Sequence, residues 1–133
     1  MKRIMILLVL VLSVISSVGQ EAPLPEPTQN PDVPFRLFRT KNIYTSLKLD
    51  TRFGLIWQVQ WALDNDHRFV APINREILVS LGTPQHPLTP KSGRYTLYPT
   101  ENIYTFVLLD QEDGRTWQVQ WGDEKQRAIF ALP

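Results

Sequence analysis

The chain has 133 residues, of which 43% are hydrophobic and 20% charged, a balance typical of a folded domain rather than a disordered chain. It contains no cysteine, which excludes disulfides, thiolate metal sites, iron–sulfur clusters and a thiol nucleophile. The formal net charge of +1, with basic residues scattered along the sequence, argues against a nucleic-acid-binding protein.

Residues 1–19 have the three parts of a secretory signal peptide. A cationic start at Lys2 and Arg3 precedes an apolar run over residues 4–15, and small and polar residues follow. A helix over this run would rise only about 18 Å, too short for a bilayer core of about 30 Å. We expect cleavage before Gln20 or one residue later, contact with the membrane only during export, and a periplasmic or extracellular location. An uncleaved membrane anchor or a buried strand is the alternative.

Residues 20–34 are rich in proline and are predicted to form a tether. Proline removes amide donors and favours extended backbone. The alternative is that this segment is a proline-motif ligand for a partner. The rest of the chain, residues 35–133, is predicted to be a single β domain made of two repeats, 35–73 and 94–133, joined by residues 74–93.

The repeat is the strongest signal in the sequence. At a constant offset of 60 positions, residues 40–61 and 100–121 share 13 identities in 22 aligned positions, and these segments contain all four tryptophans. The shared residues run from Asn-Ile-Tyr-Thr, through Leu-Asp and a glycine, to Trp-Gln-Val-Gln-Trp. A match of this quality without a gap indicates two copies of one supersecondary unit.

Each copy is predicted to be an antiparallel meander of about four strands. β-branched and aromatic residues alternate with period two in both copies. Flanking apolar runs supply the outer strands, at 35–38 and 68–71 in the first copy and at 94–98 and 128–131 in the second. In the connection, residues 77–81 are expected to form a short strand or a helical turn.

The central hairpin of each copy is predicted to have a three-residue loop that ends in a bulge at Gly54 or Gly114. In that register Leu49 faces Trp57, and the tryptophans share one apolar face with leucine and valine, which places them in the core. A loop one residue longer would pair Lys48 with Trp57 and mix polar and apolar side chains on both faces.

The predicted fold is all-β, with the two meanders packed as a pseudo-twofold sandwich or an open barrel whose tryptophan-bearing faces meet. The motif Leu-Asp-x-x-x-Gly-x-x-Trp, at 49–57 and 109–117, resembles hairpins of quinoprotein-type propeller repeats. Two blades do not close a propeller, which needs about four to eight. The whole pattern over residues 35–133 resembles small secreted bacterial proteins with tandem hairpins of this kind. The resemblance implies export and a tandem build, and no activity.

The other face of the predicted hairpins suggests a partner-binding surface. In the register above, this face is polar in the first copy and apolar in the second. An exposed apolar patch is uncommon on a monomer and marks an interaction site, although coverage by residues 74–93 would also account for it. The candidate partner-binding residues are Tyr104, Phe106, Leu108, Gln118 and Gln120.

Catalytic chemistry finds little support. His67 and His86 lack metal-ligand spacing, and no phosphate loop, nucleophile elbow or dinucleotide fingerprint is present. Asp50 and Asp110 recur beside hairpin glycines, where capping of turn amides explains them. We therefore expect a non-enzymatic protein without a cofactor that binds a protein or glycan through a sheet face or edge. The alternatives are a structural protein that assembles by strand addition and, more remotely, a carboxylate-based hydrolase.

Overall fold

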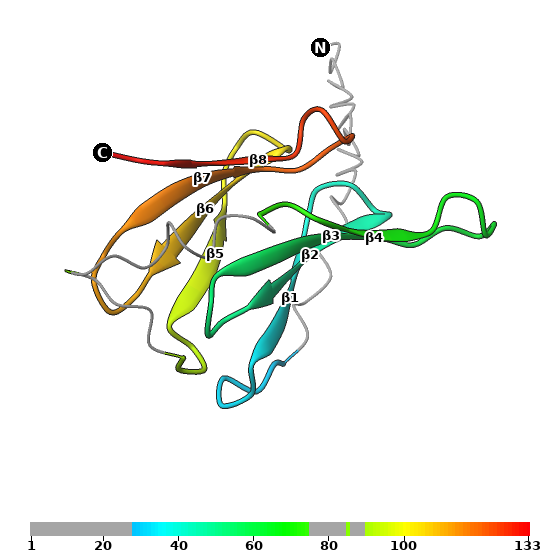
Figure 1. Cartoon of the computed structure of the whole chain (residues 1–133). Coiled ribbons are helices and arrows are strands. Elements are labelled where there is room, and N and C mark those ends of the chain that lie inside the picture. Colours follow the sequence, from blue (N-terminus) through cyan, green and yellow to red (C-terminus); the bar gives the residue numbers. More distant parts are fainter. Residues whose placement is uncertain (1–27, 75–84, 86–89) are drawn as a thin grey trace, which may run out of the picture.

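The computed structural model describes residues 28–74, 85 and 90–133, and these form two antiparallel four-stranded sheets with no helix (Figure 1). The strand orders are β1-β2-β3-β4 and β5-β6-β7-β8, so each repeat is a simple meander. The predicted all-β fold of two packed meanders is confirmed, and the sheets do not close into a barrel. The predicted signal peptide, most of the tether and the element at 77–81 lie outside the described residues.

The strands fall close to the positions that the sequence predicts. The first sheet consists of β1 (Phe35–Arg39), β2 (Thr45–Asp50), β3 (Leu55–Gln60) and β4 (Phe69–Pro72). The second consists of β5 (Tyr95–Pro99), β6 (Thr105–Asp110), β7 (Thr116–Gln120) and β8 (Ala128–Ala131). Equivalent residues are 60 positions apart in the first three strands of each repeat. They are 59 apart in the last, because the turn before β8 is one residue shorter.

The central hairpins have a four-residue loop, so the predicted register is wrong by one residue. Lys48 pairs with Trp57, and the second hairpin has the equivalent pairing. The amide of Gly54, at a φ of 71°, donates to the carbonyl of Asp50 at 2.9 Å and closes the loop. Glycine favours this left-handed backbone because it has no Cβ. A one-residue shift turns every side chain of a strand to the other face, so the predicted faces change as well.

Each sheet consequently has a tryptophan face and a leucine face. The tryptophan face carries both tryptophans of the repeated motif, at 57 and 61 or at 117 and 121. The leucine face carries the side chains at 47, 49, 56 and 58, or at 107, 109, 116 and 118. Both faces are rich in apolar side chains. The prediction failed because it assumed that only one face of each hairpin was apolar.

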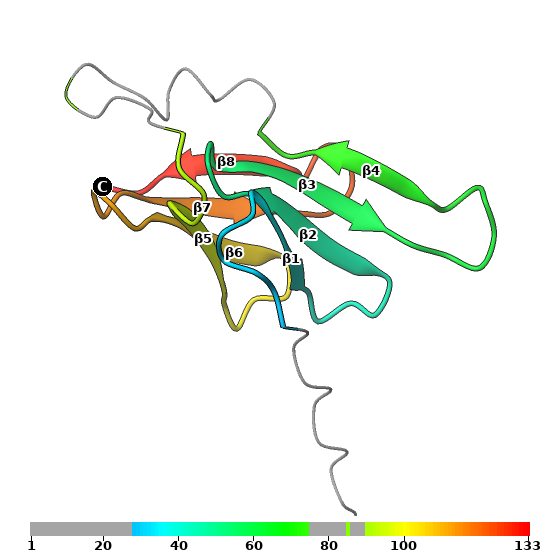
Figure 2. The same cartoon turned by 90° about the horizontal axis from the view of Figure 1, so that it is seen from below.

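The two sheets pack through unlike faces. The first sheet turns its leucine face inward, where Leu47, Leu49 and Ile56 are buried. The second sheet turns its tryptophan face inward, and this face supplies the rest of the core cluster: Tyr95, Leu97, Phe106, Leu108, Trp117, Val119 and Trp121. Figure 2 shows the first sheet, in blue to green, lying against the second, in yellow to red. The expectation that the tryptophan-bearing faces meet is therefore wrong.

Polar contacts fix the relative position of the sheets. The amide of Tyr95 donates to the carbonyl of Thr51 at 2.9 Å, and the buried hydroxyl of Thr51 accepts the amide of Gly93 at 2.9 Å. On β3, the buried Gln58 accepts two hydrogen bonds from the second repeat through its Oε1. They come from the amide of Gly122 at 3.0 Å and from Nε of Arg127 at 3.2 Å. These bonds set one orientation for a contact that is otherwise apolar.

Tyr95 is fully buried, its ring lies 6.3 Å from that of Trp117, and its hydroxyl has no hydrogen-bond partner among the described residues. Burial raises the pKa of Tyr95 to about 12. The unfolded chain loses this proton near pH 10, so stability should fall as the pH rises from about 10 to about 12. The first repeat has phenylalanine at the equivalent position.

Tyr95→Phe should therefore leave stability at neutral pH unchanged or raise it by about 1 kcal/mol, and should reduce the alkaline loss. Urea unfolding at pH 7 and pH 11 measures both effects. Tyr98→Phe, at a half-exposed site on the same strand, is the control and should behave as the wild type. A clear loss of stability at pH 7 in Tyr95→Phe would mean that the hydroxyl makes a stabilising contact.

Candidate interaction surface

The tryptophan face of the first sheet is left uncovered by the described part of the chain, and we call it the open face. Phe35, Leu37, Trp61 and Val70 on this face are each 47–56% exposed. The side chains on the open face include Phe35, Leu37, Arg39, Ser46, Lys48, Leu55, Trp57, Val59, Trp61, Val70 and Pro72.

The equivalent face of the second sheet shows that this kind of surface can be buried. Trp121, Leu97 and Tyr95 take the places of Trp61, Leu37 and Phe35, and they are only 4%, 3% and 0% exposed. The two faces therefore carry closely similar side chains, and the difference in exposure comes from the sheet that packs against one of them. Exposed apolar patches of this type mark interaction sites.

The aromatic side chains of the open face are held in position by local contacts. Nε1 of Trp61 donates to the carbonyl of Ile43 at 2.9 Å, and its ring centroid lies 5.0 Å from that of Tyr44. The ammonium group of Lys48 lies 4.7 Å from the ring centroid of Trp57. Side chains that are already ordered lose less entropy when a partner binds.

A cleft of about 780 Å³ lies next to the open face, between the turns that precede β2 and β6. Trp61 forms part of its wall, together with Phe106 and residues of both turns. Asn42 shapes the first turn by accepting the amide of Tyr44 on its side-chain oxygen at 2.8 Å, and the second repeat has the same bond. The cleft offers a mixed polar and apolar extension of the open face.

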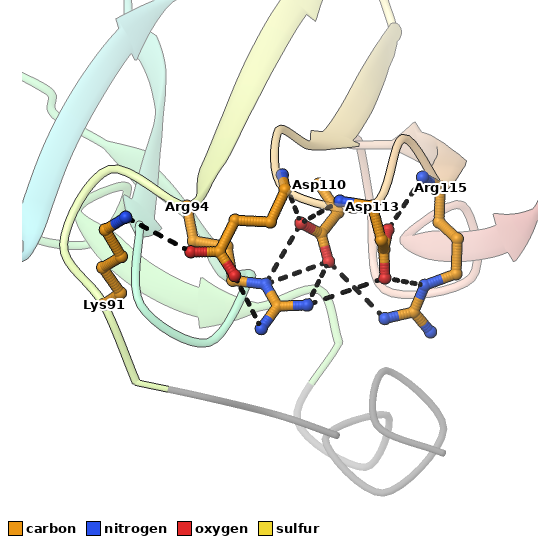
Figure 3. Close-up of polar contacts among 6 residues, drawn as sticks. Lys91, Arg94, Asp110, Asp113 and Arg115 are labelled. Atoms are coloured by element: carbon orange, nitrogen blue, oxygen red, sulfur yellow. Dashed lines mark hydrogen bonds and ion pairs between the residues drawn. The ribbon is translucent and has the colours of Figure 1, made fainter. Parts of the chain in front are cut away.

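Figure 3 shows a second candidate, a cluster of charges where β5 begins and the β6–β7 loop turns. The guanidinium of Arg94 donates to the carboxylate of Asp110 at 2.7 Å, and both side chains are buried. Asp113 accepts from Arg115 at 2.7 Å, and Glu112 lies 3.3 Å from Arg94. Each charge in the cluster faces an opposite charge, so the arrangement stabilises the loop between β6 and β7.

The two repeated aspartates cap their loops, as predicted. Oδ1 of Asp50 accepts the amide of Arg52 at 3.0 Å, and Oδ1 of Asp110 accepts the amide of Glu112 at 3.0 Å. Burial alone would raise the pKa of Asp110, but hydrogen bonds from Arg94 and from the Glu112 amide outweigh it and lower the pKa below its ordinary value. Both carboxylates are buried and hydrogen-bonded, so this geometry gives no support to a hydrolase built on them.

The structure separates the predicted partner-binding residues. Phe106 and Leu108 are 2% and 0% exposed, and they form part of the core between the sheets. Gln118 and Gln120 are half-buried on the opposite, leucine face of the same sheet. Tyr104 is exposed and packs on Trp121, with ring centroids 5.0 Å apart. The prediction that these residues share one surface is wrong, because it rested on the shorter hairpin loop.

The remaining candidates are the two histidines, of which only His67 lies among the described residues. His67 lies in an exposed turn with Nδ1 2.7 Å from Asp64, a contact that lowers the pKa of that carboxyl group, and His86 is outside the described residues. No cluster suited to a metal ion occurs among the residues that the structure describes. Within the same ranges there is no apolar helix of the length that a bilayer crossing requires.

No protein-family model, curated protein or solved structure matches the chain. The features of the described residues that bear on function are the open face and the cleft beside it.

Proposed function

We propose that the chain is an exported, non-enzymatic binding protein whose partner, a protein or a glycan, docks on the open face. The observation that carries this proposal is the contrast between the two repeats. The first repeat exposes Trp61 and Phe35, whereas the second buries Trp121 and Tyr95 at the equivalent positions. Export is proposed on the sequence of residues 1–19.

The side chains of the open face suit this role. Aromatic residues are enriched where protein surfaces bind partners, because a rigid ring buries a large area at low entropic cost. Flat aromatic faces such as that of Trp61 also stack on the apolar sides of sugar rings. Lys48 adds one positive charge beside these rings, which favours a partner with an acceptor or an acidic group opposite it.

At the first sheet, binding at a face is favoured over strand addition because the middle residue of the free edge of β1 already has hydrogen-bond partners. The side chain of Gln29 accepts the amide of Leu37 at 2.7 Å and donates to its carbonyl at 2.9 Å, in the way that a neighbouring strand would. At the far edge of the first sheet, β4 ends at Pro72, which has no amide to donate. Covered or interrupted edges of this kind discourage pairing with another chain.

The double variant Phe35→Ser/Leu37→Ser should weaken partner binding at least tenfold, since central apolar contacts dominate interface energies. The matched control is Leu63→Ser in the β3–β4 turn, where an 88% exposed leucine lies outside the open face. Binding is measured on a glycan array and to immobilised exported proteins, with circular dichroism to confirm folding. If the folded double variant binds as well as the control, the open face is not the site.

A further inference from the structure

The two sheets of one chain form a contact that two separate chains can also form. The leucine face of the first sheet packs on the tryptophan face of the second, and this contact is the core of the domain. Each sheet has one face left over: the open face of the first and the leucine face of the second. The two unused faces are therefore the counterparts of the two faces that already fit together.

The leucine face of the second sheet resembles its buried counterpart. Val107, Leu109 and Gln118 stand where the first repeat buries Leu47, Leu49 and Gln58. All three are half-buried, although their counterparts are at most 2% exposed. Two large apolar side chains on this face are more than half exposed: Tyr98 at 52% and Phe130 at 53%.

We propose that the partner at the open face is a second copy of this chain, whose second sheet docks there through its leucine face. This inference rests on the proposed function, because it names the occupant of the same surface. The two faces are different surfaces, so the contact is head-to-tail and every added copy again presents one free face of each kind. A repeated head-to-tail contact closes when its rotations complete a circle. In β-propellers, which are rings of four-stranded meanders, about four to eight sheets complete the circle, and that number of sheets corresponds here to a ring of two, three or four chains.

One hydrogen bond between the two sheets of a chain has an equivalent between chains. Gln118 of one copy occupies the position of Gln58, whose Oε1 accepts from Arg127 at 3.2 Å. The residue equivalent to Arg127 in the first repeat is Arg68, which the neighbouring copy would supply at this point. The sequence thus retains an amide side chain and an arginine at these two positions. Nε of Arg68 donates to the carbonyl of Ala62 at 2.7 Å within its own turn, so this bond must be exchanged when Gln118 of another copy docks.

Three differences make the contact between chains weaker than the internal one. On the leucine face of the second sheet, Thr116 stands where the first sheet buries Ile56. Phe106 and Leu108 in the core correspond to Ser46 and Lys48 on the open face. Burying Lys48 under a second sheet requires a partner for its ammonium group, because an unpaired buried charge is costly. We therefore expect a reversible ring whose population rises with concentration.

Sedimentation velocity and native mass spectrometry of the purified chain over a range of concentrations measure the assembly. The expected result is a monomer at low concentration and one discrete larger species of two, three or four chains at high concentration. A monomer at every concentration would overturn the proposal, and so would an open-ended series of sizes, because a ring stops growing when it closes.

Two variants test whether the contact is head-to-tail. Leu37→Glu alters the open face and Phe130→Glu alters the leucine face of the second sheet, and each protein alone should remain monomeric. An equal mixture should form a heterodimer and nothing larger, since each pair of chains retains one intact contact. Lys125→Glu, in the exposed turn between β7 and β8 and away from both unused faces, should assemble as the wild type does. If Phe130→Glu alone still forms a dimer, the contact joins two open faces and the proposal is wrong.

Both substituted residues are about half exposed, so folding should survive, and Leu37→Ser with Phe130→Ser repeats the test with milder changes. The assembly and the proposed function fail in different ways. A monomeric protein whose open-face variants lose binding to a glycan or another protein would refute the ring and leave the proposed function standing. A monomer whose binding does not respond to these variants would refute both.

Discussion

Trp121→Ala is expected to lower the free energy of unfolding by about 3–5 kcal/mol, whereas Trp61→Ala should cost about 1 kcal/mol. The two tryptophans occupy the same place in the repeat. Nε1 of each donates to the carbonyl of an isoleucine at 2.9 Å, and each ring centroid lies 5.0 Å from that of a tyrosine. They differ in exposure, which is 4% for Trp121 and 50% for Trp61. The pair therefore isolates the contribution of packing between the sheets.

Urea unfolding followed by circular dichroism gives both values, and it should be done at a concentration where the chain is monomeric. Equal losses in the two variants would contradict the packing of unlike faces, because that packing buries only one of the two rings. At a higher concentration the loss in Trp61→Ala should increase if the open face is covered by a second copy.

Much of the fold follows from local sequence patterns. The strands near 35, 69, 95 and 128, the four-stranded meanders and the glycine-containing hairpin loops were all predictable, because alternation and turn residues act over a few positions. The hairpin register was not predictable. Choosing between loops of three and four residues required knowing which face is apolar, and in this chain both faces are.

The interaction surface depends on packing between segments far apart in the sequence. The contrast between Lys48 and Leu108 is visible in the sequence, and it does separate an exposed face from a buried one. The prediction interpreted the apolar copy as the binding surface, although Leu108 is apolar because it lies in the core. Only the relative placement of the two sheets shows that the equivalent, more polar copy is the exposed one.

Arg94→Met is expected to lower the free energy of unfolding by about 3–5 kcal/mol at neutral pH, because it leaves the carboxylate of Asp110 buried without its main counter-charge. The two side chains are 4% and 0% exposed and 2.7 Å apart. In the wild type the pKa of Asp110 is lowered, so the stabilisation is present above the unfolded-state value of about 3.9 and is lost as the pH falls through the lower folded value.

The variant should show a weaker dependence on pH. Without Arg94, the Asp110 carboxylate keeps the Glu112 amide and Arg115, whose Nη2 lies 3.5 Å away, but loses its nearest counter-charge. Its pKa should therefore rise from the wild-type value, and less stability should be lost as the pH falls. Adding Asp110→Asn to Arg94→Met should restore part of the loss at neutral pH, because asparagine still accepts the Glu112 amide without a charge. Arg52→Met removes the matching contact with Asp50 in the first repeat, where the arginine side chain is 35% exposed, and should have only a small effect.

Urea unfolding between pH 3 and pH 8 compares the four proteins. If Arg94→Met loses stability on acidification in parallel with the wild type, the carboxylate in this loop is hydrated, and the buried ion pair does not determine the stability of the second repeat.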